Sequence, residues 1–322
     1  MKKQTGHFAP QSFCALFAHL CVYCLQLWRG LSISAQSFNL IHRLMRIVSL
    51  AHLTLPGASP LQLIDHAAQA GFDHIGMRIV APTTDSRMAL PLGDRSLRTS
   101  ILRRLAETGI KVLDIEAWWL SAEFNATGIE PAFGFGAEMG ARYAIVSGND
   151  PVRNRFLDHL DVVCQIGARV GVQILLEFIP YSQVCTIWDA ADCLASINRP
   201  NIGILVDALH LSRSGGSVAD VVANLHRLRF LHLCDAPKLP PQTIEAMRHE
   251  ARGNRLYPGE GELDLRELIA VTPADVPIAI EAPHAGFTDQ SPVDKARRAR
   301  VATLDLITDV ERTRRSEEEK TR

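Results

Sequence analysis

The chain alternates between two hydrophobic periods from Met45 onward. Short apolar runs rich in Ile, Leu and Val recur about every 30 residues, and segments with apolar residues three to four positions apart separate them. Such runs are typical of strands buried on both faces. The runs lie at 46–53, 74–80, 111–118, 143–148, 173–179, 202–208, 229–235 and 277–283. Eight strands that alternate with helices predict a single-domain α/β fold, a (β/α)8 TIM barrel.

The intervening segments carry residues that begin and end helices. Ser59 and Pro60 suit the first positions of a helix over 59–71, and Gly71 suits its end. Further helices are predicted over 96–109, 156–171 and 186–197. A doubly wound open sheet is the alternative fold. It normally contains fewer strands, and no Gly-x-Gly-x-x-Gly follows the first strand here, which weakens a dinucleotide-binding interpretation.

The two ends of the chain differ from this pattern. Residues 1–44 contain an apolar stretch followed by small residues, which superficially resembles a secretory signal peptide. Because MRIVSLAHLTL begins the first convincing strand, we interpret 1–44 as an extension outside the fold, produced by a misassigned start or by a signal-like segment. The barrel is then expected over 45–310, and the charged residues 311–322 are expected to form a solvated tail.

Composition and charge restrict the partners. A net charge of −1 offers no electrostatic reason to expect nucleic acid or an anionic membrane. The chain is 47% hydrophobic and 21% charged, which is ordinary for an enzyme with a large core. Its seven cysteines are scattered without the paired spacing of a zinc ribbon. We expect reduced thiols and therefore a cytoplasmic location.

Four of the apolar runs end on residues that can bind a metal ion. These are Glu177, Asp207, His232 and Glu281, at the ends of predicted strands five to eight. A buried carboxylate is costly without a partner, and strand ends meet at one mouth of a barrel. The four side chains are therefore expected to converge on a divalent cation. Oxygen and imidazole ligands suit Mn²⁺, Mg²⁺, Co²⁺ or Zn²⁺, and the absence of thiolates argues against a structural zinc site.

The motifs around these residues resemble the xylose isomerase-like TIM barrels, a family of sugar phosphate isomerases and epimerases, over about residues 45–310. The similar motifs are VDALH, FLHLCDAP, RLYPGEGELD and IAIEAPH. The resemblance implies that Glu177, Asp207, His232 and Glu281 bind the metal. In the ketose 3-epimerase branch of the family the two glutamates also act as acid and base, which implies catalytic roles for Glu177 and Glu281. Because barrels of this family often associate, a homo-oligomer is possible.

Four further residues are candidates for binding substrate. His210 and Arg255 match family positions near the substrate, although His210 could instead support the site and Arg255 could pair with an acid at the surface. Glu116 follows strand three and could hydrogen-bond a substrate hydroxyl or form an ion pair. Trp118 could line the mouth with its indole, as sugar-binding sites often do, or pack in the core.

Several functions remain open at this stage. We predict a metal-dependent isomerase or epimerase that acts on a sugar, sugar phosphate or polyol through an enediolate. A lyase of the dehydroshikimate- or inosose-dehydratase type shares the first proton transfer and is the alternative. The ketose 3-epimerase pattern places an arginine soon after the strand-seven histidine, whereas this chain has Cys234 to Lys238 there. A DNA-cutting barrel of the endonuclease IV type needs more histidines and a basic groove, and a non-catalytic binding barrel needs no paired glutamates.

Overall fold

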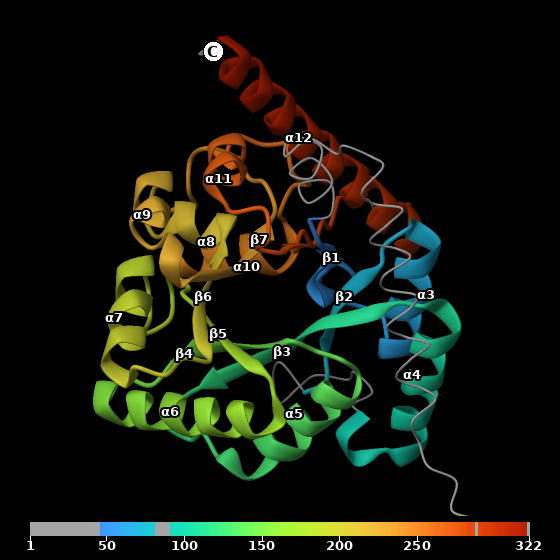
Figure 1. Ribbon diagram of the computed structural model, residues 1–322, viewed down its shortest axis with the longest axis vertical. Helices are drawn as coiled ribbons and strands as arrows, with labels where there is room; N and C mark the ends of the chain where they lie inside the picture. Colours follow the sequence, from blue (N-terminus) through green and yellow to red (C-terminus); the bar gives the residue numbers. More distant parts are fainter. Residues whose placement is uncertain (1–45, 81–90, 287–288, 321–322) are drawn as a thin grey trace, which may run out of the picture. The chain divides into compact units, whose positions relative to one another are not determined.

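Eight parallel strands close into a barrel in sequence order (Figure 1), which confirms the predicted (β/α)8 fold. The computed structural model describes residues 46–80, 91–286 and 289–320. The proposed extension 1–44 lies outside these residues. The strands are β1 (Val48–Leu50), β2 (His74–Arg78), β3 (Lys111–Leu120), β4 (Tyr143–Gly148), β5 (Gln173–Glu177), β6 (Ile202–Asp207), β7 (Leu228–Leu233) and β8 (Ile278–Ile280).

The helices form a ring around the barrel (Figure 1). Ser59 caps the first of them with a capping box, and Gly71 ends it with a φ of 85°, as the sequence predicts. The helices are α3 (Pro60–Ala70), α4 (Arg95–Thr108), α5 (Ile129–Glu138), α6 (Arg153–Val170), α7 (Ile187–Ile197), α8 (Ala208–Arg213), α9 (Val218–Ala223), α10 (Ile244–Gly253), α11 (Leu265–Val271) and α12 (Pro292–Lys320).

The last helix, α12, continues without a break from Pro292 to Lys320, so the described part of the expected solvated tail 311–322 is helical. Charged side chains there are mostly exposed, and Figure 1 shows this end of α12 running beyond the rest of the barrel. Within the described ranges, no helix combines the length and the apolar character needed to cross a membrane.

The strands bury apolar side chains on both faces. The outer face packs against the helices in one large cluster, and a separate cluster fills the interior of the barrel. The interior cluster contains Ala51, Leu113, Tyr143, Ile145, Leu175, Leu205, Phe230 and Ala279. Bulky members come from β3 to β7, whereas the members next to them are the small Ala51, which directly follows β1, and Ala279 of β8. The interior is therefore filled unevenly.

A glycine on α5 fixes how closely this helix approaches β3. A Cβ added at Gly136 would lie 2.5 Å from Cδ1 of the buried Ile115, whereas a Cβ at Gly134 would meet nothing within 4 Å. We expect Gly136→Ala to lower the free energy of unfolding by about 1–3 kcal/mol through overpacking. Gly134→Ala on the same helix should raise it by about 0.5–1 kcal/mol. Urea unfolding of the pair measures both, and equal shifts would contradict the packing argument.

Candidate metal centre

Glu177, Asp207, His232 and Glu281 come together at the mouth of the barrel. One potential ligand atom from each lies within 4.8 Å of the others, and all four residues are buried. Parallel pairing explains the convergence, because Asp207 at the end of β6 is in register with His232 of β7. Glu177 is the last residue of β5, and Glu281 directly follows β8. The sequence-predicted ligand set is therefore one spatial cluster in the described structure.

The imidazole of His232 faces the three carboxylates. Its Nδ1 lies 3.6 Å from Glu281 Oε2, 3.9 Å from Glu177 Oε1 and 4.0 Å from Asp207 Oδ2. These distances are too long for hydrogen bonds, and Nδ1 is buried without a partner among the described residues. An unpaired nitrogen that faces three carboxylate oxygens matches the mixed nitrogen and oxygen ligands that Zn²⁺, Mn²⁺ and Co²⁺ accept.

Arg255 lies beneath the cluster. Only 1% of this residue is exposed, and its Nη1 donates to Asp207 Oδ2 at 2.6 Å while Nη2 lies 3.0 Å from Glu281 Oε2. Its Nε donates to the carbonyl of Ala251 at 2.8 Å, which fixes the guanidinium plane. With all three carboxyl groups ionised and His232 neutral, as they would be when binding a metal, the cluster and Arg255 carry a formal charge of −2, because −3 and +1 are combined. A divalent cation would balance that charge.

The two carboxylate oxygens of Asp207 make different contacts. Oδ1 accepts hydrogen bonds from the backbone N–H groups of Leu209 and His210, at 2.8 and 3.1 Å, and so caps the N-terminus of α8. Oδ2 faces Arg255 and the ligand cluster. The carboxylate plane is therefore held by three hydrogen bonds before any cation binds. Such second contacts orient metal ligands and raise affinity.

The two glutamates have opposite electrostatic environments. Burial, together with the charge of Glu281, raises the pKa of Glu177 to about 8. Burial alone would also raise the pKa of Glu281, but the positive charges of Arg255 and His232 outweigh it and hold this pKa well below its usual range. Carboxyl groups with separated pKa values are suited to different proton-transfer roles. One acid and one base can therefore coexist at this site.

A cavity of about 330 Å³ opens above the cluster, which is sufficient for a monosaccharide-sized ligand. The predicted site residues Glu116, His210 and Arg255 line it together with Glu177, His232 and Glu281. Residues that the sequence analysis did not single out also line it. These are Ser147, Tyr181 and Arg252. Ser147 Oγ lies 3.4 Å from Glu177 Oε2. The position of Ser147 near the end of β4 is the sequence feature that could have identified it as a cavity residue.

Glu116 occupies the opposite wall of this cavity. Its Oε1 accepts from the backbone N–H of His52 at 3.0 Å, and its Oε2 accepts from Arg78 Nε at 3.4 Å. The ion pair that was one of the two alternatives for Glu116 is present, and Glu116 also lines the cavity, while its hydrogen bond to a substrate hydroxyl stays a prediction. The arrangement places a charged pair, Arg78 and Glu116, where hydroxyl groups of a ligand could be bound.

His210 lies on the first turn of α8 and is buried. Burial lowers the pKa of its imidazole to about 4, so the ring is neutral at physiological pH. Its Nδ1 has no hydrogen-bond partner among the described residues, and its ring meets that of Tyr181 edge-on at 5.9 Å. A neutral imidazole with one unused nitrogen at a cavity wall can bind a hydroxyl group.

Trp118 does not line the cavity. Its indole packs edge-on against Phe133 of α5, with ring centroids 5.0 Å apart, in the cluster between strands and helices. The register between β3 and β4 shifts between Ile115 and Trp118, so the strict alternation expected from Glu116 is broken there. The next residue, Trp119, lines the cavity instead.

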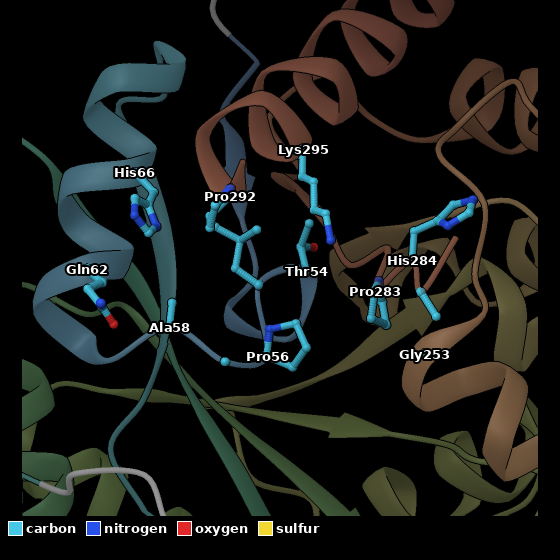
Figure 2. A pocket seen from close by; sticks show the side chains of 13 residues that line it. Thr54, Pro56, Ala58, Gln62, His66, Gly253, Pro283, His284, Pro292 and Lys295 are labelled. Atoms are coloured by element: carbon cyan, nitrogen blue, oxygen red, sulfur yellow. The ribbon is translucent and has the colours of Figure 1, made fainter. Parts of the chain in front are cut away.

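A second cavity lies nearby, between the segment after β1, the segment after β8 and the start of α12 (Figure 2). It measures about 500 Å³, and Gln62, His66, His284 and Lys295 are its main polar lining residues. Among the described residues that line it, none is a carboxylic acid. This larger cavity therefore lacks both the ligand set and an acid–base pair, and we place the chemistry in the smaller one.

Comparison with known proteins agrees with the fold. The profile of the family described as xylose isomerase-like TIM barrel matches residues 64–300. The chain belongs to this family. The predicted family resemblance is thereby confirmed.

Curated relatives include two proteins named inosose isomerase. The one from Bacillus licheniformis is 25% identical over 165 residues, which cover 49% of this chain and 57% of the relative. The one from Halalkalibacterium halodurans is 25% identical over 123 residues, which cover 37% and 42%. The matched segments thus span about half the length of these relatives.

Solved structures share the fold at lower identity. The IOLI protein, solved with a bound zinc atom, has a TM-score of 0.67 and 21% identity, with 83% of this chain and 99% of that chain covered. The probable 3-DHS dehydratase AsbF from Bacillus anthracis has a TM-score of 0.64 and 16% identity, with 80% and 98% covered. D-Allulose 3-epimerase from Methylomonas sp. has a TM-score of 0.60 and 18% identity, with 82% and 97% covered.

Proposed function

We propose that this protein is a divalent-metal-dependent isomerase or epimerase of a sugar or related keto-polyol. The observation that carries the proposal is the buried cluster of Glu177, Asp207, His232 and Glu281 at the base of a sugar-sized cavity. The curated relatives named inosose isomerase support a cyclic keto-polyol as the first substrate to test. Free Cys164, Cys185, Cys193 and Cys234 suit the cytoplasmic location that we also propose.

The chain's own residues supply the proton transfers in this proposal. Bound at the four ligands, a divalent cation would act as a Lewis acid that makes a carbon next to a substrate carbonyl more acidic. Glu281 and Glu177 then act as the acid–base pair, one removing a proton from that carbon and the other returning one. Their opposite pKa directions favour Glu281 as the ionised base. Asp207 and Arg255 keep the ligand oxygens in place.

The other cavity residues orient the substrate in this proposal. Arg78 and Glu116 provide a charged pair for hydroxyl groups on one side, and His210 provides a neutral nitrogen on the other. Trp119 is proposed in place of Trp118 as the indole that packs against the substrate. The partly enclosed cavity separates the reacting carbon from bulk water, which protects a charged intermediate.

A dehydratase on the same scaffold is the second candidate. The probable 3-DHS dehydratase AsbF shares the fold, and loss of a β-hydroxyl can follow the same first proton removal. The two functions differ only after that step. An unsaturated product distinguishes the dehydratase from the isomerase or epimerase.

One set of assays tests metal dependence, proton removal and the identity of the product separately. Purified protein is stripped with a chelator and assayed in D₂O with no metal, Mn²⁺, Co²⁺ or Zn²⁺, against an inosose, D-allulose and 3-dehydroshikimate. We expect about one cation per chain, and deuterium incorporation next to the carbonyl of at least one substrate, detected by NMR. A stereoisomer or an isomeric ketone identifies the proposed activity, whereas a conjugated product identifies the dehydratase. A protein that binds none of these cations contradicts the proposal.

A further inference from the structure

Asp114 of β3 is a buried acid that the proposed reaction does not use. None of its surface is exposed, and neither carboxylate oxygen has a hydrogen-bond partner among the described residues. Burial of a polar group without a partner is unfavourable, so nearly all such groups in native proteins are satisfied by protein or by enclosed water. An acid left in this state inside a barrel therefore requires an explanation.

The carboxyl group of Asp114 points into the interior of the barrel. Asp114 is in register with Gly76 of β2, and a Cβ added at Gly76 would lie 2.5 Å from Asp114 Oδ2. Only glycine leaves this space open. Burial raises the pKa of this carboxyl group to about 8, and the charges of Glu116, His232 and Glu281 also act on it.

The side of the His232 ring that faces away from the carboxylates is also unsatisfied. Its Nε2 is buried without a hydrogen-bond partner among the described residues, and so is the Oγ of Ser49 on β1. Ser49 is in register with Ala279 of β8, and Ala279 is in register with His232. Paired residues of parallel strands point to the same face, so all three side chains belong to the barrel interior.

The path around the barrel from Asp114 to His232 is lined by unusually small side chains. In strand order it passes Gly76, Ala51 and Ala279, where a TIM barrel is normally filled by branched residues. Small side chains leave space, and several unpaired polar atoms border this space. Such a place suits enclosed water, which needs two to four polar partners. Asp114, Ser49 and His232 provide them.

We propose that Asp114 is a positioning residue for the metal ligand His232 and acts through enclosed water that also contacts Ser49. The water accepts from His232 Nε2–H and donates to a carboxyl oxygen of Asp114. This arrangement keeps the proton on Nε2 and leaves the Nδ1 lone pair directed at the cation. Hydrogen bonds of this kind fix the tautomer and the ring orientation of metal-binding histidines. The inference rests on the proposed metal site and adds a residue on the opposite side of the barrel to it.

Two substitutions test this inference. Asp114→Leu removes the acceptor, and Asp114→Asn keeps an acceptor oxygen of similar shape. We expect Asp114→Leu to weaken Co²⁺ affinity about 10- to 100-fold and to change the Co²⁺ absorption spectrum, with Asp114→Asn closer to wild type. Gly76→Ala displaces the carboxylate without removing it and should also weaken binding. Affinity is measured by competition with a chelator, and unfolding of the metal-free proteins is measured in parallel.

Asp150→Leu is the matched control, because it also replaces a buried acid with leucine, but at a residue that pairs with Arg155 and does not line the metal cavity. Its Co²⁺ affinity should equal that of the wild type even if its stability falls. Wild-type affinity and spectrum in both Asp114→Leu and Gly76→Ala would overturn this inference alone. A wild-type protein that binds no Co²⁺, Mn²⁺ or Zn²⁺ would overturn the proposed function and this inference with it.

Discussion

Glu281→Gln is expected to lower the rate of proton exchange at the substrate carbon by about 100- to 10,000-fold, the range that a positioned general base contributes. Glutamine keeps the shape of the side chain and one oxygen near the ligand cluster, but it cannot accept the proton. Burial would raise the pKa of Glu281, but the positive charges of Arg255 and His232 hold it low. For this reason we propose Glu281 as the ionised base of the pair. The rate is measured by NMR as deuterium incorporation into the substrate found in the metal-dependent assay.

Metal content decides how such a loss is interpreted. The variant is assayed with excess cation and its bound metal is measured, because Glu281 is also a proposed ligand. Glu123→Gln removes an exposed carboxylate from the segment after β3 and should leave the rate unchanged. A Glu281→Gln protein that is loaded with metal and exchanges protons at the wild-type rate would exclude Glu281 as the base.

Arg255→Met should have the largest effect on stability. The guanidinium is almost fully buried and contacts Asp207 and Glu281 together, so its loss leaves these carboxylates without their nearest positive charge. Removing one partner of a buried ion pair costs about 3–5 kcal/mol, much more than removing an exposed pair. We expect a loss of this size in the free energy of unfolding of the metal-free protein, measured by urea unfolding in the presence of a chelator.

Arg155→Met provides the comparison. Arg155 also pairs with a buried acid, Asp150, but 42% of the arginine side chain is exposed, so water can replace much of the interaction. Its loss should therefore lower the free energy of unfolding much less than the loss of Arg255 does. Similar losses in the two variants would mean that burial does not set the strength of the Arg255 contacts.

The eight-strand barrel was predictable because its signal is local and repeated. Each strand is apolar on both faces, and terminal residues such as Ser59 and Gly71 mark a helix independently of the rest of the fold. The charged end was expected to be solvated, but the extent of α12 could not be predicted, because a polar sequence does not show whether a helix stops or continues without packing. Its strong charge indicated exposure, which the described part of that segment has.

The ligand cluster was predictable for a related reason. Ionisable residues at the ends of buried strands of a barrel lie together at its mouth, where they need a charged or polar partner. The environment of Arg255 was not, because its long side chain reaches back to Asp207 across 48 positions of sequence. The placement of Trp118 depends on a shift in register, which alternation alone does not reveal. The role proposed for Asp114 could not be predicted from the sequence. It depends on hydrogen bonds that are missing in the folded interior of the barrel.

The four candidate ligands all come from the second half of the chain, on consecutive strands β5 to β8. Arg78, Glu116 and Trp119, which we propose to contact substrate, come from β2 and β3 in the first half. In the proposed function, the metal ligands and the acid–base pair therefore come from the second half, whereas most substrate contacts, apart from that of His210, come from the first half. Changes in the first half can alter which molecule is accepted while the second half retains the same cation and the same acid–base pair. One such scaffold can diversify its substrates without rebuilding its chemistry.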